Sequence, residues 1–197
     1  MTQVIIVLVI LGTIVIYFVT SYNKLVSMKG RIKASIQEIA NQLKRQSSLI
    51  PNLQESAKAF LAQEKGIFET LANARKAVDD AVASGNLQSM DQASNLVTKA
   101  LEGFRVVVES NPQIKSDQVI TQLMNELRDT ADKVMYARRT LIDLVADYNI
   151  MIATLPVNII ASMAGFKPEE GLKVEDMTAA TSVSAEEMKD PQVKLTP

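Results

Sequence analysis

The chain has 197 residues, and its 21 lysines and arginines against 22 aspartates and glutamates give a net charge of −1 at pH 7. This balance excludes the strong basic field typical of nucleic-acid-binding proteins, so no nucleic-acid partner is expected. Histidine and cysteine are absent, which removes the commonest general base, the commonest zinc ligands and the thiol nucleophile. We therefore expect a non-enzymatic protein with no catalytic residue, no metal site and no cofactor.

The first predicted element is a membrane anchor. Residues 4–19 carry no charge, and with their polar shoulders they give a helix of about 20 residues, roughly 30 Å long, which is enough to cross a bilayer. A cleaved secretory signal is the alternative, but no basic residue precedes the run and a poor cleavage site follows it. We expect residues 4–22 to be a retained transmembrane helix, with residues 1–3 as a short extracytoplasmic N-terminus.

Basic residues directly after the span set the predicted orientation. Lys24, Lys29, Arg31 and Lys33 all precede the first acidic residue, Glu38. Positively charged flanks stay in the cytoplasm, so the N-terminus is expected outside the cell and the rest of the chain inside it. These four basic side chains are predicted to lie at the membrane interface.

A helical repeat of apolar residues fills most of the remaining chain. The 7 glycines and 6 prolines are few, and apolar residues recur every three or four positions from Ile32, as on a helix with one buried face. Stop signals at 84–86, 110–112 and 155–156 separate the helices. With a further break near Pro51, the pattern predicts an all-α fold, in which the anchor is followed by an up-and-down antiparallel bundle of four long helices.

Pro51 allows two interpretations of that first break. Proline has no backbone N–H and disfavours helical geometry at the residue before it, which favours a tight corner over residues 47–50. The apolar phase is preserved across Pro51, which favours one long kinked helix instead. We favour the corner.

The end of the fourth helix leads into an uncharged segment and then an acidic one. Residues 155–166 contain no charge, and four helices would return them to the membrane surface. We expect a short interfacial helix there, and capping of the bundle core is the equally weighted alternative. Residues 167–197 hold seven acids and four lysines and are predicted to be a flexible acidic tail. The side chains expected in the acyl boundary are Ile159, Ile160, Met163 and Phe166.

Several short motifs follow one another from the anchor to Phe166, among them residues 22–26, residues 49–53, residues 148–149 and residues 155–161. Taken together, these motifs are similar to the LemA family of bacterial membrane proteins. The resemblance implies a single-span inner-membrane protein with a helical cytoplasmic domain over residues 23–166, but no activity, because that family has no agreed biochemical function. Gln63, Asn111 and Thr140 depart from the usual family pattern. The motif residues, to which we assign structural roles, are Leu49, Ile50, Pro51, Asn52, Leu53, Tyr148, Asn149, Pro156, Asn158, Gly165 and Phe166.

Two classes of function remain. The first is a scaffold bound to the lipid bilayer that forms a homo-oligomer through coiled-coil-type packing, because residues 5–16 and 106–108 place apolar side chains over more than one helix face. The alternative is a single-span adaptor or sensor that recruits an unidentified cytosolic protein through its bundle surface or acidic tail.

Overall fold

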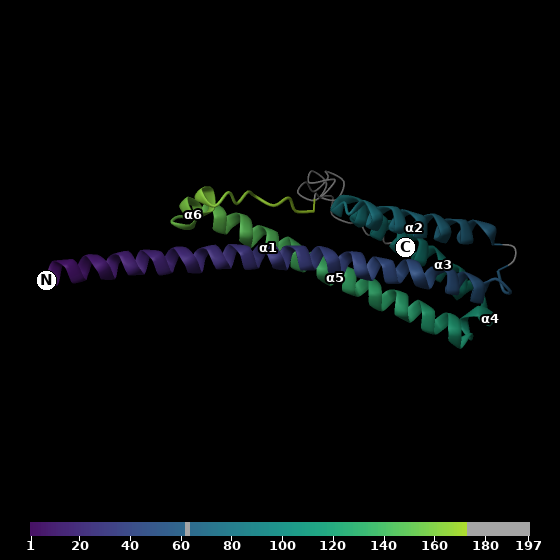
Figure 1. The fold of residues 1–197 in the computed structure, drawn as a ribbon. Helices are drawn as coiled ribbons and strands as arrows, with labels where there is room; N and C mark the ends of the chain where they lie inside the picture. The colour runs from purple at the N-terminus through teal and green to yellow at the C-terminus, as the bar shows by residue number, and fades with distance from the viewer. Residues whose placement is uncertain (62–63, 173–197) are drawn as a thin grey trace, which may run out of the picture.

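The structure is a computed structural model that describes residues 1–61 and 64–172. Every regular element in these residues is a helix, which confirms the all-α class (Figure 1). The helices are α1 (Thr2–Ala57), α2 (Lys65–Ser84), α3 (Leu87–Ser110), α4 (Pro112–Lys115), α5 (Gln118–Ala153) and α6 (Val157–Met163).

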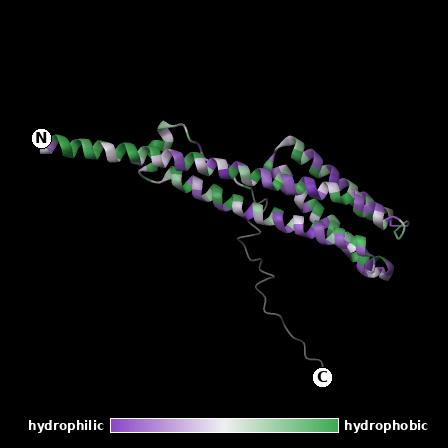
Figure 2. Cartoon of the chain, turned by 60° about the horizontal axis from the view of Figure 1, so that its bottom comes forward, coloured by the Kyte–Doolittle hydropathy of each residue, from purple (hydrophilic) through white to green (hydrophobic). Residues whose placement is uncertain are grey.

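Residues 1–20 of the chain, nearly all in α1, are exposed, and this end of the helix extends beyond the rest of the molecule (Figure 1). Figure 2 shows this part of α1 as an almost unbroken apolar rod, whereas the other long helices alternate between apolar and polar residues. The mean hydropathy of its most apolar window is 2.8, and it is long enough to span a membrane. The expected N-terminal anchor is therefore a helix of suitable length and composition.

The predicted corner at residues 47–50 is wrong. α1 continues through Pro51 to Ala57 as one helix of 56 residues, about 84 Å at 1.5 Å per residue. The physical reason is burial, because Ile50 and Leu53 are fully buried on the same face of α1 as Leu43. Keeping this face in register offsets the hydrogen bond that Pro51 cannot donate. The alternative agrees with the structure in that one helix continues across Pro51, and this helix ends at Ala57, before α2 begins at Lys65.

α1 is the element against which the other long helices pack. α5 runs antiparallel along it, and the α2–α3 hairpin packs against its C-terminal half (Figure 1). Ser35 Oγ donates to the carbonyl oxygen of Ala137 at 2.9 Å and links α1 to α5. Ser47 Oγ donates to Asp79 Oδ1 at 2.6 Å and links α1 to α2. An ion pair between Arg138 and Asp91 joins α5 to α3.

The three breaks predicted at residues 84–86, 110–112 and 155–156 are confirmed, the last by the interval between α5 and α6. Gly85 ends α2 in the left-handed conformation (φ 65°), and Asn86 caps α3 by accepting the N–H of Ser89. Asn111 separates α3 from α4. α5, the last long helix, starts at Gln118, because Asp117 accepts the N–H groups of the next helical turn and so begins a new helix.

Candidate functional site

The motif residues fall into two groups, one at residues 49–53 and a second at residues 148–166, and the second group binds the chain that follows α6. Tyr148 is fully buried, and its hydroxyl donates to the carbonyl oxygen of Lys167 at 3.0 Å. The Asn149 side chain makes two hydrogen bonds with the backbone of Glu169, donating to its carbonyl and accepting from its N–H, each at 2.9 Å. Two adjacent residues of α5 therefore hold residues 167–169, which we call the strap, in an extended path along the helices.

The strap also reaches α1. Lys29 Nζ lies 2.8 Å from Glu169 Oε1, and this hydrogen-bonded pair raises the pKa of the Lys29 ammonium above its usual value. Burial raises the pKa of the Tyr148 hydroxyl, so it stays protonated and able to donate. The Lys29–Glu169 pair is partly exposed and contributes little stability alone. Its effect is geometric, because Glu169 is bound to α5 through Asn149 and to α1 through Lys29.

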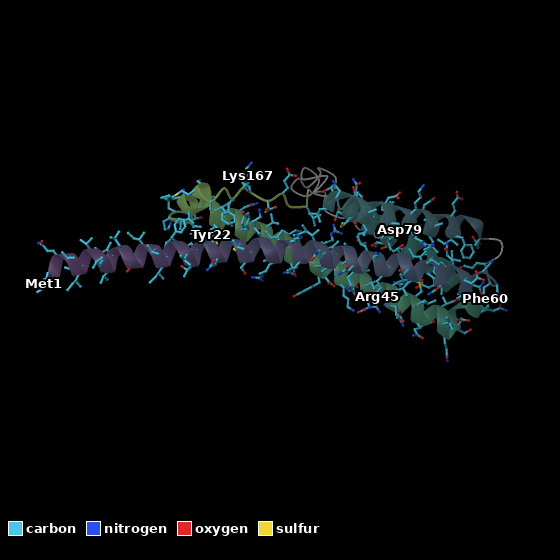
Figure 3. The ribbon with its side chains drawn as sticks, in the orientation of Figure 1. Met1, Tyr22, Arg45, Phe60, Asp79 and Lys167 are labelled. Carbon is cyan, nitrogen blue, oxygen red and sulfur yellow. The ribbon has the colours of Figure 1, made fainter. Side chains whose placement is uncertain are left out.

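A turn at Gly165 returns the chain from α6 to α1. Gly165 is left-handed (φ 73°), and the N–H groups of Gly165 and Phe166 donate back to the carbonyls of Ser162 and Ala161. This is the Schellman arrangement, which favours glycine at that position. The turn places the Phe166 ring 5.6 Å from the Tyr22 ring in an edge-to-face contact. Figure 3 shows Tyr22 close to α6 and Lys167 on the segment that leaves it.

Pro156 and Asn158 lie at the start of α6. Pro156 is the N-cap residue of α6, follows a cis peptide bond, and precedes the first helical residue. The N–H of Asn158 donates to the carbonyl of Thr154 at 2.9 Å, which closes the turn between α5 and α6. The motif residues from 148 to 166 thus belong to one structural unit at the end of α5.

The first motif group lies far from that unit, at the C-terminal end of α1. Ile50 and Leu53 are fully buried, whereas Leu49 and Pro51 are half-buried and Asn52 is exposed. Gln54 beside them donates through Nε2 to the carbonyl of Phe68 on α2 at 2.8 Å. These residues hold α2 against α1, so the two motif groups do not form a common site.

The predicted acidic tail, residues 167–197, does not start at residue 167 as expected. Residues 167–172 were expected to be flexible, but they are hydrogen-bonded to α5, paired with α1 and, at Leu172, packed against the core. No local pattern predicts these contacts, because the partners of Glu169 lie 20 and 140 residues earlier in the chain. The rest of the predicted acidic tail, residues 173–197, lies outside the described residues.

The predicted interface residues separate into two groups. Lys24, Lys29, Arg31 and Lys33 are all exposed just beyond the apolar part of α1. Ile159 and Met163 are exposed on α6, at 55% and 74%. Ile160 is only 6% exposed and faces the protein, so its predicted place in the acyl boundary is corrected. Phe166 is half-buried against the core.

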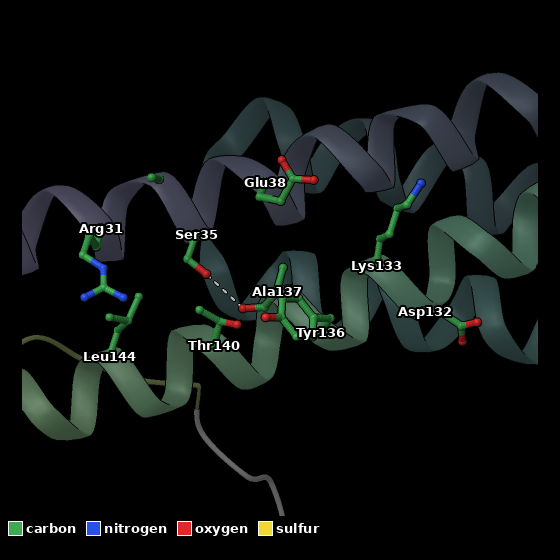
Figure 4. Close-up of a pocket in the computed structure, with 10 residues that line it drawn as sticks. Arg31, Ser35, Glu38, Asp132, Lys133, Tyr136, Ala137, Thr140 and Leu144 are labelled. Atoms are coloured by element: carbon green, nitrogen blue, oxygen red, sulfur yellow. Dashed lines mark hydrogen bonds between the residues drawn. The ribbon is translucent and has the colours of Figure 1, made fainter.

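An open groove of about 580 Å³ runs between α1 and α5 (Figure 4). Its floor holds the hydrogen bond from Ser35 to Ala137, and charged side chains stand at both ends. Sequence reasoning missed this groove; the available signal was the small size of Ala34, Ser35 and Ala137, which leaves space between the helices. All of its lining residues belong to α1 or α5: Arg31, Ala34, Ser35, Glu38, Asp132, Lys133, Tyr136, Ala137, Thr140 and Leu144.

A family model for the LemA family matches residues 35–185, more than three quarters of the chain. The chain belongs to the LemA family. No curated protein matches it. LemA membership indicates a membrane-associated protein, in agreement with the apolar N-terminal part of α1. The matched region includes both motif groups, the strap and all of the groove lining except Arg31 and Ala34, and it extends beyond the domain end expected at residue 166.

Proposed function

We propose that this LemA protein is a non-enzymatic scaffold of the bacterial inner membrane that self-associates through the α1–α5 groove. Its four long helices would act as an up-and-down bundle on the cytoplasmic side. The groove supports this proposal because α2 and α3 contribute no residue to its lining. One unbroken helix joins the anchor to this surface. Two copies anchored in the same membrane would therefore have their grooves at the same distance from the bilayer.

The charges along the groove suit a second copy of the same chain. Two copies anchored side by side in one membrane would be related by a two-fold axis along the membrane normal, so residues at equal distance from the bilayer would meet. Glu38 of α1 lies at the same end of the groove as Lys133 of α5 (Figure 4). Nearer the anchor, Arg31 lines a second groove with Asp143. Glu38 of one copy would therefore face Lys133 of the other, which also pairs with Asp129 of its own chain at 2.7 Å, and Asp143 would face Arg31, which favours parallel pairing.

Residues 106–108, whose apolar side chains favoured self-association in the sequence, are only partly exposed in the structure. Val107 and Val108 are half-buried and pack against the core of their own chain, so they are not free to contact a second subunit. Val106 is 67% exposed on α3. On the groove, Tyr136 is 74% exposed and offers a large ring suited to an interface.

Self-association is tested by the mass of the full chain in mild detergent. We expect a mass at a multiple of 21.6 kDa, and replacement Tyr136→Glu should shift it toward the single chain because a buried carboxylate would meet Glu38. Val106→Glu is the matched control, an equally exposed apolar residue away from the groove, and should leave the mass unchanged. A strictly monomeric wild-type protein across concentrations would contradict the proposal and favour the adaptor.

The proposed topology has the N-terminus outside and the helical domain in the cytoplasm. It is supported by the basic residues that follow the apolar part of α1. A reporter fused after Pro197 should be active only in its cytoplasmic form. Replacing Lys24, Lys29, Arg31 and Lys33 together with glutamine should give a mixture of orientations, whereas replacing four exposed basic residues of α2 and α5 should not. Activity of a periplasmic reporter on the wild-type chain would contradict this orientation.

A further inference from the structure

The uncharged segment at residues 155–166 contains α6, a helix that lies across the direction of α5. α6 is bent by 92° from α5, and α5 runs along α1 (Figure 1). If α1 crosses a bilayer, α6 therefore lies close to the plane of its surface. The Phe166–Tyr22 contact fixes its level, because Tyr22 stands where the free apolar part of α1 ends.

The two faces of α6 have different surroundings. Val157, Ile160 and Ala161 are buried against the protein, at 9%, 6% and 2% exposure. On the other side Ile159 and Met163 are exposed, and so is Leu155, at 70%, in the turn before the helix. The segment therefore does cap the core, as one of the two sequence interpretations expected. The capping face accounts for Val157, Ile160 and Ala161 and leaves Leu155, Ile159 and Met163 uncovered.

The surface beside these exposed residues is also apolar. On α1, Val19, Tyr22 and Val26 are each 41–49% exposed, and on α5 Ile150 is 64% exposed. Lysines frame the patch, with Lys24 on α1 and Lys167 at the start of the strap, both exposed. An apolar patch continuous with a membrane anchor and edged by basic side chains suits the boundary between lipid headgroups and acyl chains.

We propose that α6 is a second membrane contact, with Leu155, Ile159 and Met163 inserted at the headgroup–acyl boundary and the bilayer as the partner. The Schellman turn at Gly165 and the strap fix α6 to α1 and α5, so this contact sets the tilt of the helical domain relative to the membrane. The proposal depends on the anchor but not on self-association.

Single-cysteine variants of the full chain test this contact, because the sequence has no native cysteine. Met163→Cys and Met135→Cys are a matched pair: both replace methionines of similar exposure, at 74% and 65%. Met135 lies 18 residues before the end of α5, about 27 Å farther from the membrane. Each variant is labelled with an environment-sensitive dye and reconstituted in phosphatidylcholine vesicles that contain acyl-chain nitroxide lipid, and only protein that floats with the vesicles is measured.

We expect the dye at Met163 and at Ile159→Cys to be strongly quenched, close to the level of Ile10→Cys in the anchor, and the dye at Met135 to keep its intensity. Equal, weak quenching at Met163 and Met135 would overturn the proposal. So would a blue-shifted but unquenched dye at Met163, which would mean that a second copy covers α6. Loss of quenching at Ile10 as well would overturn the anchor and this proposal together. Unchanged helix content by circular dichroism shows that each variant is folded.

Discussion

Replacement Tyr148→Ala is expected to lower the free energy of unfolding by about 3–5 kcal/mol. Tyr148 is the largest fully buried side chain, and alanine would leave a cavity where α5 contacts α1 and the strap. The same change removes the hydroxyl that holds the carbonyl of Lys167. Urea unfolding of the full chain in mild detergent, followed by circular dichroism, measures the change.

Replacement Tyr148→Phe is the control that separates packing from hydrogen bonding. Phenylalanine keeps the ring and removes only the bond to Lys167, so we expect a loss of about 1 kcal/mol. Limited proteolysis near residue 167 should be faster in both variants than in the wild type. If the two variants lost equal stability, the hydroxyl and not the ring would be the main contribution, which would contradict the cavity argument.

The helix breaks that sequence reasoning located correctly depend on local chemistry. Gly85 and Asn111 end or cap helices through their own backbone and side-chain preferences, which neighbours a few residues away can satisfy. The break at Pro51 was misplaced because tertiary burial overrode the local preference. Ile50 and Leu53 need contact with other helices to be buried, and that gain cannot be read from the proline itself.

In the candidate site, too, the residues predicted from local motifs were found, and those that depend on partners far away in the chain were missed. Motif resemblance singled out Tyr148, Asn149 and Gly165, and the structure explains all three through the strap and its turn. Glu169 was assigned to the tail, because an acidic residue in a polar segment carries no signal of a partner on α1. The α1–α5 groove was missed for a related reason, since a hollow between two helices depends on which small residues face each other.

Replacement Pro51→Ala is expected to raise the free energy of unfolding by about 2 kcal/mol, roughly 4–8 °C in Tm for a chain of this size. Proline in a helix interior costs about 3 kcal/mol, and about 1 kcal/mol of this is offset because proline restricts the unfolded chain. Alanine restores an N–H that can donate to the carbonyl of Ser47, and Ile50 and Leu53 already hold this part of α1 in helical form.

Replacement Pro51→Gly separates the restored hydrogen bond from helix propensity. Glycine also restores the N–H but is about 1 kcal/mol less favourable than alanine within a helix, so its gain should be smaller than that of alanine. Thermal unfolding of the three proteins in the same detergent gives the order alanine, glycine, proline. If Pro51→Ala were instead less stable than the wild type, the half-buried proline ring would contribute more by packing against the core than the missing hydrogen bond costs. Pro51 would then stabilise the contact of α1 with α2, whereas the expected order means that α1 tolerates it at a cost to stability.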